Sequence, residues 1–229
     1  IILTLLLIYF ISLILYILGN IINSKPFNNN NLEPISVIVA VKNGALSLPN
    51  ILNDLENQNY EGAVEYIIVD DQSADNSKDI IKKFQNNNNN FKYVSSKDGN
   101  PKLNFKKRAL DAGINKSNFN ILLFTDVDCR LKKTWVTAMV KAFNTDVDYV
   151  IGVSKIDKTH NIITWFQKID LMMLFSVSRG MCNLNIPFAS IGQNQAYKKD
   201  LYEKIGFMSI SDSIQGDDTL FLQLCVKQN

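Results

Sequence analysis

The hydrophobic pattern divides the chain into an uncharged N-terminal stretch and a longer mixed part. Residues 1–24 carry no charged side chain, and residues 1–18 are apolar apart from four hydroxyl-bearing side chains. As a helix, residues 1–18 would extend about 27 Å, which is close to the hydrocarbon thickness of a bilayer. A signal peptide is the alternative, but its apolar region is shorter, follows basic residues and ends in small ones. We therefore predict a transmembrane helix over residues 1–19.

A polar linker is predicted next, over residues 20–32, where Pro26 and a run of asparagines replace the apolar pattern. A separate domain over residues 33–229 would then stand off the membrane. The chain begins without Met and stops inside an apolar, helix-like stretch, so we expect this domain to be truncated at its C-terminus.

Short β-branched runs alternate with helical patterns in the predicted domain. Runs typical of buried parallel strands occupy residues 35–41, 66–70, 91–96, 120–126 and 148–154. Between them, apolar residues recur at helical spacing, as at Leu48, Ile51 and Leu55. The alternation predicts an α/β fold, in which helices flank a Rossmann-like, mostly parallel sheet.

A longer apolar pattern at residues 164–181 predicts a single helix after these strands. A core helix is one interpretation. Its large side chains, such as Trp165 and Phe166, exceed what one buried face needs, so a helix lying at the membrane surface is the other. Three charged residues make the segment a poor membrane span.

Composition and charge exclude several function classes. The 229 residues include 24 Lys and Arg against 22 Asp and Glu, a net charge of +2, so no nucleic-acid partner is expected. Cys129, Cys182 and Cys225 have no CxxC spacing, which argues against a disulfide framework or a thiolate zinc site. His160 is the single histidine, so motifs that need two are excluded. We expect carboxylates to be the reactive groups.

Acidic residues follow two predicted strands. Ligands of open α/β sheets bind beyond the carboxyl ends of strands, where Asp70, Asp71, Asp126 and Asp128 fall. Helix capping is the simpler interpretation of Asp71. On an extended chain Asp126 and Asp128 would face the same side, where Mg²⁺ or Mn²⁺ bridging a diphosphate would offset their charge.

A third acidic pair, Asp217 and Asp218, precedes a helical pattern. A helix N-cap is one interpretation, and a general base beside a ligand is the other. Lysines and an arginine at 102 and 106–108 could neutralise phosphate, whereas the phosphate-binding motifs GxxxxGK[ST] and GxGxxG are absent.

Six stretches resemble, in the expected order, the family 2 glycosyltransferases. They are ISVIVAVKNGALSLPNILNDLENQNY, EYIIVDDQSADNS, KKRALDAGI, ILLFTDVDC, IGQNQAYKKDLYEKIGF and QGDDTLFLQ. The resemblance implies the GT-A nucleotide-diphospho-sugar transferase fold and inverting, metal-dependent transfer from a UDP-sugar to a glycan or lipid acceptor. The N-terminal helix and linker are similar to the membrane-bound branch related to cellulose, chitin and poly-N-acetylglucosamine synthases, which implies a cytoplasmic catalytic domain.

The resemblance also implies a nucleotide site at the ends of the first two strands. Ala40, Val41 and Asn43 would lie against the base. Asp71 would hydrogen-bond the uracil ring, and Asp70 would support that loop.

Roles in the reaction follow from the same resemblance. Lys106 would lie near the ribose or diphosphate, while Asp126 and Asp128 would hold the divalent cation. Asp218 would be the catalytic base, with Asp217 where many relatives carry Glu.

An acceptor and donor-sugar pocket is implied at Gly192, Asn194, Ala196 and Tyr197. A nucleotidyltransferase on the same fold is a weaker alternative, because the first strand is not followed by a Gly-rich loop ending in basic residues. The alternative from another class is a catalytically silent nucleotide-sugar-binding subunit of a membrane complex. The intact acids argue against it, since a silent copy has no need to keep them.

Overall fold

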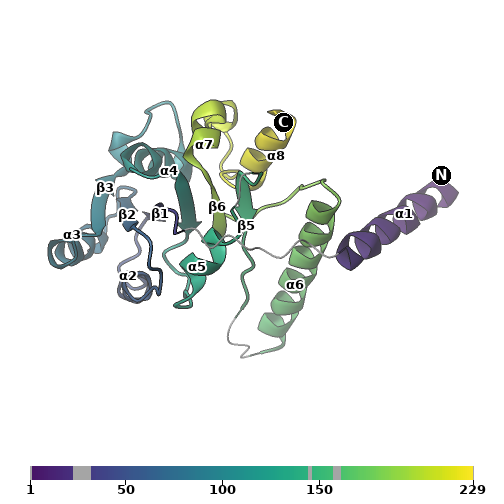
Figure 1. The fold of residues 1–229 in the computed structure, drawn as a ribbon, viewed down its shortest axis with the longest axis horizontal. Coiled ribbons are helices and arrows are strands. Elements are labelled where there is room, and N and C mark those ends of the chain that lie inside the picture. The colour runs from purple at the N-terminus through teal and green to yellow at the C-terminus, as the bar shows by residue number, and fades with distance from the viewer. Residues whose placement is uncertain (1, 23–31, 144–145, 157–160, 229) are drawn as a thin grey trace.

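The computed structural model describes residues 2–22, 32–143, 146–156 and 161–228 (Figure 1). Most of the linker predicted at 20–32, together with His160, lies outside the described residues. An N-terminal helix, α1 (Ile2–Ile21), precedes an α/β domain.

A six-stranded sheet with the order β3-β2-β1-β4-β6-β5 forms the centre of this domain. The strands are β1 (Ile35–Val41), β2 (Val64–Asp70), β3 (Phe91–Ser95), β4 (Ile121–Thr125), β5 (Tyr149–Ile151) and β6 (Asn194–Lys198). Strands β1 to β4 pair in parallel, whereas β6 is antiparallel to its neighbours β4 and β5. Only β6 therefore runs against the rest, which confirms the predicted mostly parallel sheet.

Helices cover both faces of the sheet. Side chains of each strand point alternately to the two faces, and each set packs against the helices on its side. Val37 and Val39 pack in a cluster with α2 (Leu48–Glu56), α3 (Ser77–Asn87) and α5 (Trp135–Val140). Ile38 packs in the opposite cluster with α4 (Phe105–Lys116), α7 (Lys199–Ile205) and α8 (Thr219–Gln228). Two short 3₁₀ turns occupy Ser96–Asp98 and Met208–Ile210.

The long helix predicted at 164–181 is confirmed as α6 (Ile162–Asn183). The core-helix interpretation is wrong, since only Phe175, Ser178 and Gly180 of this helix are buried. Among the described residues, α1 is the one helix that is long and apolar enough to cross a membrane.

Glu65 on β2 ties several strands together at the edge of the sheet where they begin. Its buried carboxylate accepts hydrogen bonds from Ser36 Oγ on β1 (2.6 Å), Lys92 Nζ on β3 (2.5 Å) and the Asn118 backbone N–H before β4 (2.6 Å). Burial acts to raise the pKa of Glu65, but these donors outweigh it and hold the pKa below its usual value.

We expect Glu65→Gln to lower the free energy of unfolding by about 1–3 kcal/mol at pH 7, because buried donors would lose a charged acceptor. Since the folded-state pKa is depressed, the stabilisation by Glu65 is present above the unfolded pKa and is lost as pH falls through the folded pKa. Urea unfolding of the full chain in mild detergent at a series of pH values measures both effects. Glu61→Gln, on the exposed loop before β2, is the control, and equal losses in the two variants would contradict the assignment.

Candidate functional site

The ends of β1 and β2 bring the predicted nucleotide-binding residues side by side. Val41 pairs with Asp70 across these strands, and the Asp71 N–H donates to the Val41 carbonyl (2.7 Å). The Val41 side chain is fully buried, while Ala40 is half-buried. Only the backbone of Val41 can therefore face a ligand. The Asp71 carboxylate lies 3.8 Å from Lys42 Nζ and retains 14% of its exposure.

The loops after β1 and β2 are locked to each other by reciprocal hydrogen bonds. Asn43 has a positive φ of 51°; its N–H donates to Ser73 Oγ (2.9 Å), and its Oδ1 accepts from the Ala74 N–H (2.8 Å). The buried Asp70 carboxylate accepts from the Ser73 N–H (3.2 Å). Asp70 therefore holds the loop after β2 by a buried hydrogen bond. Its neighbour Asp71 is the more accessible of the two acids.

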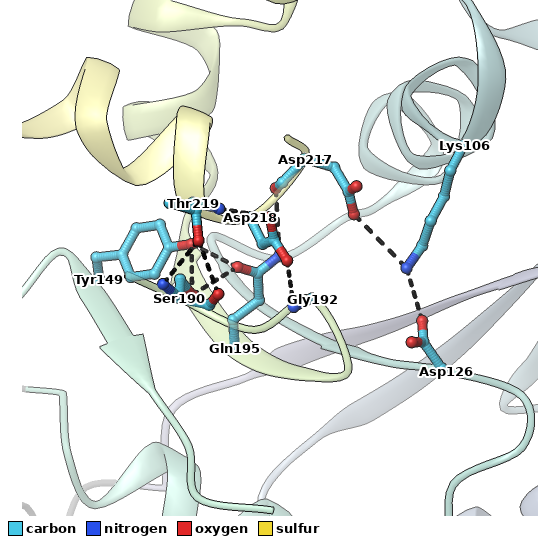
Figure 2. Close-up of polar contacts among 9 residues, drawn as sticks. All are labelled: Lys106, Asp126, Tyr149, Ser190, Gly192, Gln195, Asp217, Asp218 and Thr219. Carbon is cyan, nitrogen blue, oxygen red and sulfur yellow. Dashed lines mark hydrogen bonds and ion pairs between the residues drawn. The ribbon is translucent and has the colours of Figure 1, made fainter. Parts of the chain in front are cut away.

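Lys106, at the start of α4, joins two acids from distant parts of the chain (Figure 2). Its Nζ lies 2.6 Å from Asp126 Oδ1, directly after β4, and 3.5 Å from Asp217 Oδ2, just before α8. Desolvation acts to lower the pKa of Lys106, but Asp217 and Asp126 outweigh it and raise that pKa. The ammonium is therefore charged at neutral pH and sits between two carboxylates.

Asp218 is held by two backbone donors. The Gly192 N–H donates to Asp218 Oδ2 (3.1 Å), and the Thr219 N–H donates to Asp218 Oδ1 (2.5 Å) (Figure 2). A Cβ at Gly192 would lie only 3.2 Å from Asp217 Oδ2 and 3.5 Å from Lys106 Nζ. Glycine at this position lets the backbone approach both acids closely.

The turn that carries Asp217 and Asp218 is fixed by a polar network that the sequence did not reveal. Thr219 Oγ1 accepts from the Ser190 N–H (3.1 Å) and donates to the Ser190 carbonyl (2.9 Å). The fully buried Gln195 on β6 donates to the Asp217 carbonyl (3.3 Å) and accepts from the Tyr149 hydroxyl (Figure 2). No sequence signal pointed to this network, because the strand that carries Gln195 is not among the predicted ones; the structure shows that its buried amide needs these hydrogen-bond partners.

Three of the four residues predicted to line a sugar pocket are instead buried in the sheet. Ala196 and Tyr197 are fully buried, because β6 has strands on both edges and a hydrophobic cluster on each face. Asn194 accepts from Trp135 Nε1 (3.0 Å) and donates to the Val153 carbonyl (3.1 Å). The structure contradicts a pocket-lining role for the Ala196 and Tyr197 side chains, whereas Gly192 does lie beside the acids.

Tyr197 contributes to the site through packing. Its ring lies 4.5 Å from the Phe124 ring on β4 and 4.9 Å from the Phe221 ring on α8, measured between centroids. Aromatic pairs at these separations are favourable contacts. They hold α8, and with it the turn at Asp217 and Asp218, against the sheet.

Asp126 and Asp128 occupy a turn, so the extended chain expected here is wrong. The Cys129 N–H donates to the Asp126 carbonyl (3.1 Å), and Asp128 is exposed. Among the described residues, no group of three or more His, Cys, Asp or Glu side chains is arranged to hold a metal. Asp126 and Asp128 supply two carboxylates at this turn, and Mg²⁺ or Mn²⁺ is commonly bound by one or two carboxylates plus substrate phosphates.

Comparison with known proteins assigns the chain to a family. Residues 36–206 match the family model described as Glycosyl transferase family 2. The chain is 28% identical over 156 residues to the poly-β-1,6-N-acetyl-D-glucosamine synthase of Staphylococcus aureus, covering 67% of this chain and 36% of that protein. It is 26% identical over 184 residues to the probable glycosyltransferase YdaM of Bacillus subtilis, covering 78% of this chain and 44% of that protein. The chain thus spans less than half the length of these relatives.

Solved structures share the fold. A mannosyltransferase from Pyrobaculum calidifontis, in complex with GDP-Man and Mn²⁺, has a TM-score of 0.65 at 18% identity, covering 85% of this chain and 54% of that one. Glucosyl-3-phosphoglycerate synthase from Mycobacterium tuberculosis, in complex with UDP, has a TM-score of 0.52 at 15% identity, covering 74% of this chain and 58% of that one. These similarities confirm the predicted GT-A fold. Since the family model also matches most of the chain, this protein belongs to glycosyltransferase family 2.

Proposed function

We propose that residues 33–229 form the catalytic domain of a membrane-anchored, inverting glycosyltransferase. It transfers a sugar from a UDP-sugar to a hydroxyl of a glycan or lipid acceptor. The observation that carries the proposal is the contact of Lys106 with Asp126 and Asp217, beside Asp218, at the carboxyl ends of the strands. The relatives support it, since one is a polysaccharide synthase and solved neighbours hold UDP or GDP-Man.

The donor half of the site combines a cation with carboxylates. Lys106 lies in the first turn of α4, where the helix dipole also favours a bound anion such as a diphosphate. Asp126 and Asp128 would hold the divalent cation, which when bound stabilises negative charge on the diphosphate leaving group. Asp71, at the end of β2, would accept a hydrogen bond from the uracil ring. These residues orient the donor with its diphosphate toward Lys106.

The acceptor half depends on Asp218 as the general base. Each of its oxygens accepts a hydrogen bond from one backbone N–H. A carboxylate oxygen has a second lone pair, which can accept a hydrogen bond from the hydroxyl group of the sugar acceptor. Asp218 would take the hydroxyl proton while the acceptor oxygen bonds to the anomeric carbon and the bond to the diphosphate oxygen breaks. A single displacement of this kind inverts the anomeric centre. Asp217 would hold Lys106 in place rather than take the proton.

Asp128→Asn should weaken manganese-dependent UDP binding by about 10- to 100-fold, because the cation would lose a charged ligand. Isothermal titration of the full chain with UDP, with and without Mn²⁺, measures the effect. Asp79→Asn, on the exposed face of α3, is the control and should bind UDP like the unmodified protein. Unchanged UDP affinity in Asp128→Asn would remove Asp128 from the proposed site.

Asp218→Asn should lower kcat by about 10²- to 10⁴-fold and leave UDP affinity within a few-fold, because the amide keeps the shape but cannot accept the proton. UDP release from a panel of UDP-sugars in the presence of membranes measures turnover. Asp217→Asn is the matched comparison and should weaken donor binding, since Lys106 loses a partner. Unmodified turnover by Asp218→Asn would refute its role as the base.

Deleting residues 1–24 should abolish carbonate-resistant attachment to membranes, because α1 is the described helix able to span a bilayer. Alkaline extraction followed by flotation compares the truncated and full chains. Attachment of the truncated chain that resists carbonate would show that α1 is not the anchor.

A further inference from the structure

Helices α1 and α6 cross at a close contact between small residues. A Cβ at Gly19 would lie 2.8 Å from Gly180 Cα, so only glycine allows this approach. Tyr16 Oη and Ser176 Oγ are hydrogen-bonded (3.0 Å), and Asn183 Nδ2 donates to the Gly19 carbonyl (2.9 Å). Small residues together with polar side chains that bond across the interface are typical of helix pairs in and near membranes.

The crossing places α6 at the end of α1 that is nearer the catalytic domain. Gly19 is two residues before the end of α1 at Ile21, which is about 3 Å along the helix axis. Figure 1 shows α6 between the α/β domain and α1, which runs away from that domain. If α1 spans a bilayer, α6 lies at the level where α1 leaves the hydrocarbon core.

The face of α6 that contacts α1 continues as an open apolar stripe. Positions spaced alternately by four and three residues lie on one helix face. Residues 162, 166, 169 and 173 therefore lie on the same face as Ser176 and Gly180, which contact α1. The first four side chains are apolar and exposed: Ile162 (80%), Phe166 (67%), Ile169 (37%) and Met173 (63%). α1 covers only the C-terminal part of this stripe.

The opposite face of α6 contacts the segment that leads from α6 to β6. Phe175 is buried there, and Ser178 Oγ donates to the Ala189 carbonyl (3.1 Å). The apolar stripe therefore points away from the domain and toward the side from which α1 departs.

We propose that this stripe rests on the bilayer surface, so that α6 is an in-plane membrane contact of the catalytic domain. The proposal rests on the anchoring by α1 proposed above, because the stripe is continuous with the α1 contact. Trp165 borders the stripe with 56% of its surface exposed, and tryptophan favours the headgroup level. Lys168 and Arg179 lie on one flank of α6, about three turns apart, where their long side chains can reach lipid headgroups.

Trp165 provides a direct test in the full chain. The protein has two tryptophans, and Trp135 is buried in the core, so the difference in emission between the unmodified protein and Trp165→Phe reports on Trp165. The chain is reconstituted in phosphatidylcholine and phosphatidylglycerol vesicles that carry spin labels at shallow or deep acyl positions. We expect loss of the Trp165 emission with the shallow label, less loss with the deep label, and protection from acrylamide in the water phase.

A matched pair of charge substitutions separates lipid contact from general perturbation. Phe166→Glu places a carboxylate on the stripe and should abolish the quenching by lipid labels. Gln167→Glu adds the same charge one residue away, at an exposed position on another face, and should leave the quenching unchanged.

Each other outcome overturns the proposal. Quenching of Trp165 by acrylamide but not by lipid labels would mean that the stripe faces water. Protection from both quenchers would mean that a protein surface, from another helix or a second copy, covers it. Flotation of the same vesicles distinguishes these results from failure of the α1 anchor, in which case the full chain would not float.

Discussion

The ionic contact of Lys106 with Asp126 and Asp217 is the constraint on which the proposed catalytic arrangement depends. Asp126 comes from the end of β4 and Asp217 from the turn before α8, and two carboxylates brought this close repel each other unless a cation lies between them. The lysine supplies that cation from the first turn of α4. One side chain therefore joins three elements that are far apart in the sequence and brings Asp218 next to the proposed donor site.

The single reversed strand makes this arrangement possible. Because β6 is antiparallel, it starts at the edge of the sheet where β4 ends, and Asn194 pairs with Thr125. The segment before β6 thus delivers the Gly192 N–H to the same edge as Asp126. A parallel strand at this position would bring its C-terminal end there instead, and the backbone donor to Asp218 would have to come from elsewhere.

The sequence predicts best where the signal is local. Strands β1, β2 and β4 are apolar runs that the sequence predicts, whereas β6 has no such pattern because Asn194, Gln195 and Lys198 interrupt it. Asp70 and Asp126 lie at strand ends, as the sequence predicts, whereas the burial of Tyr197 depends on side chains from neighbouring strands and helices. The hydrogen bonds from Tyr149 to Gln195 and from Gln195 to the Asp217 carbonyl link three distant segments, and hydrophobic periodicity in the sequence cannot predict such contacts.

A membrane contact along α6 would affect the proposed reaction because the chain runs directly from α6 to the backbone that contacts Asp218. A single spanning helix leaves a domain free to turn about the helix axis, whereas a second contact beside it fixes both the height and the direction of the domain. α6 ends at Asn183, which bonds to α1, and the chain reaches Gly192 nine residues later. Ser178 and Thr219 hold the Ala189 and Ser190 carbonyls within that stretch. The backbone that positions Asp218 is thus attached at one end to the helix that we place on the bilayer. In the proposed reaction, the depth of α6 would set where the acceptor hydroxyl meets Asp218.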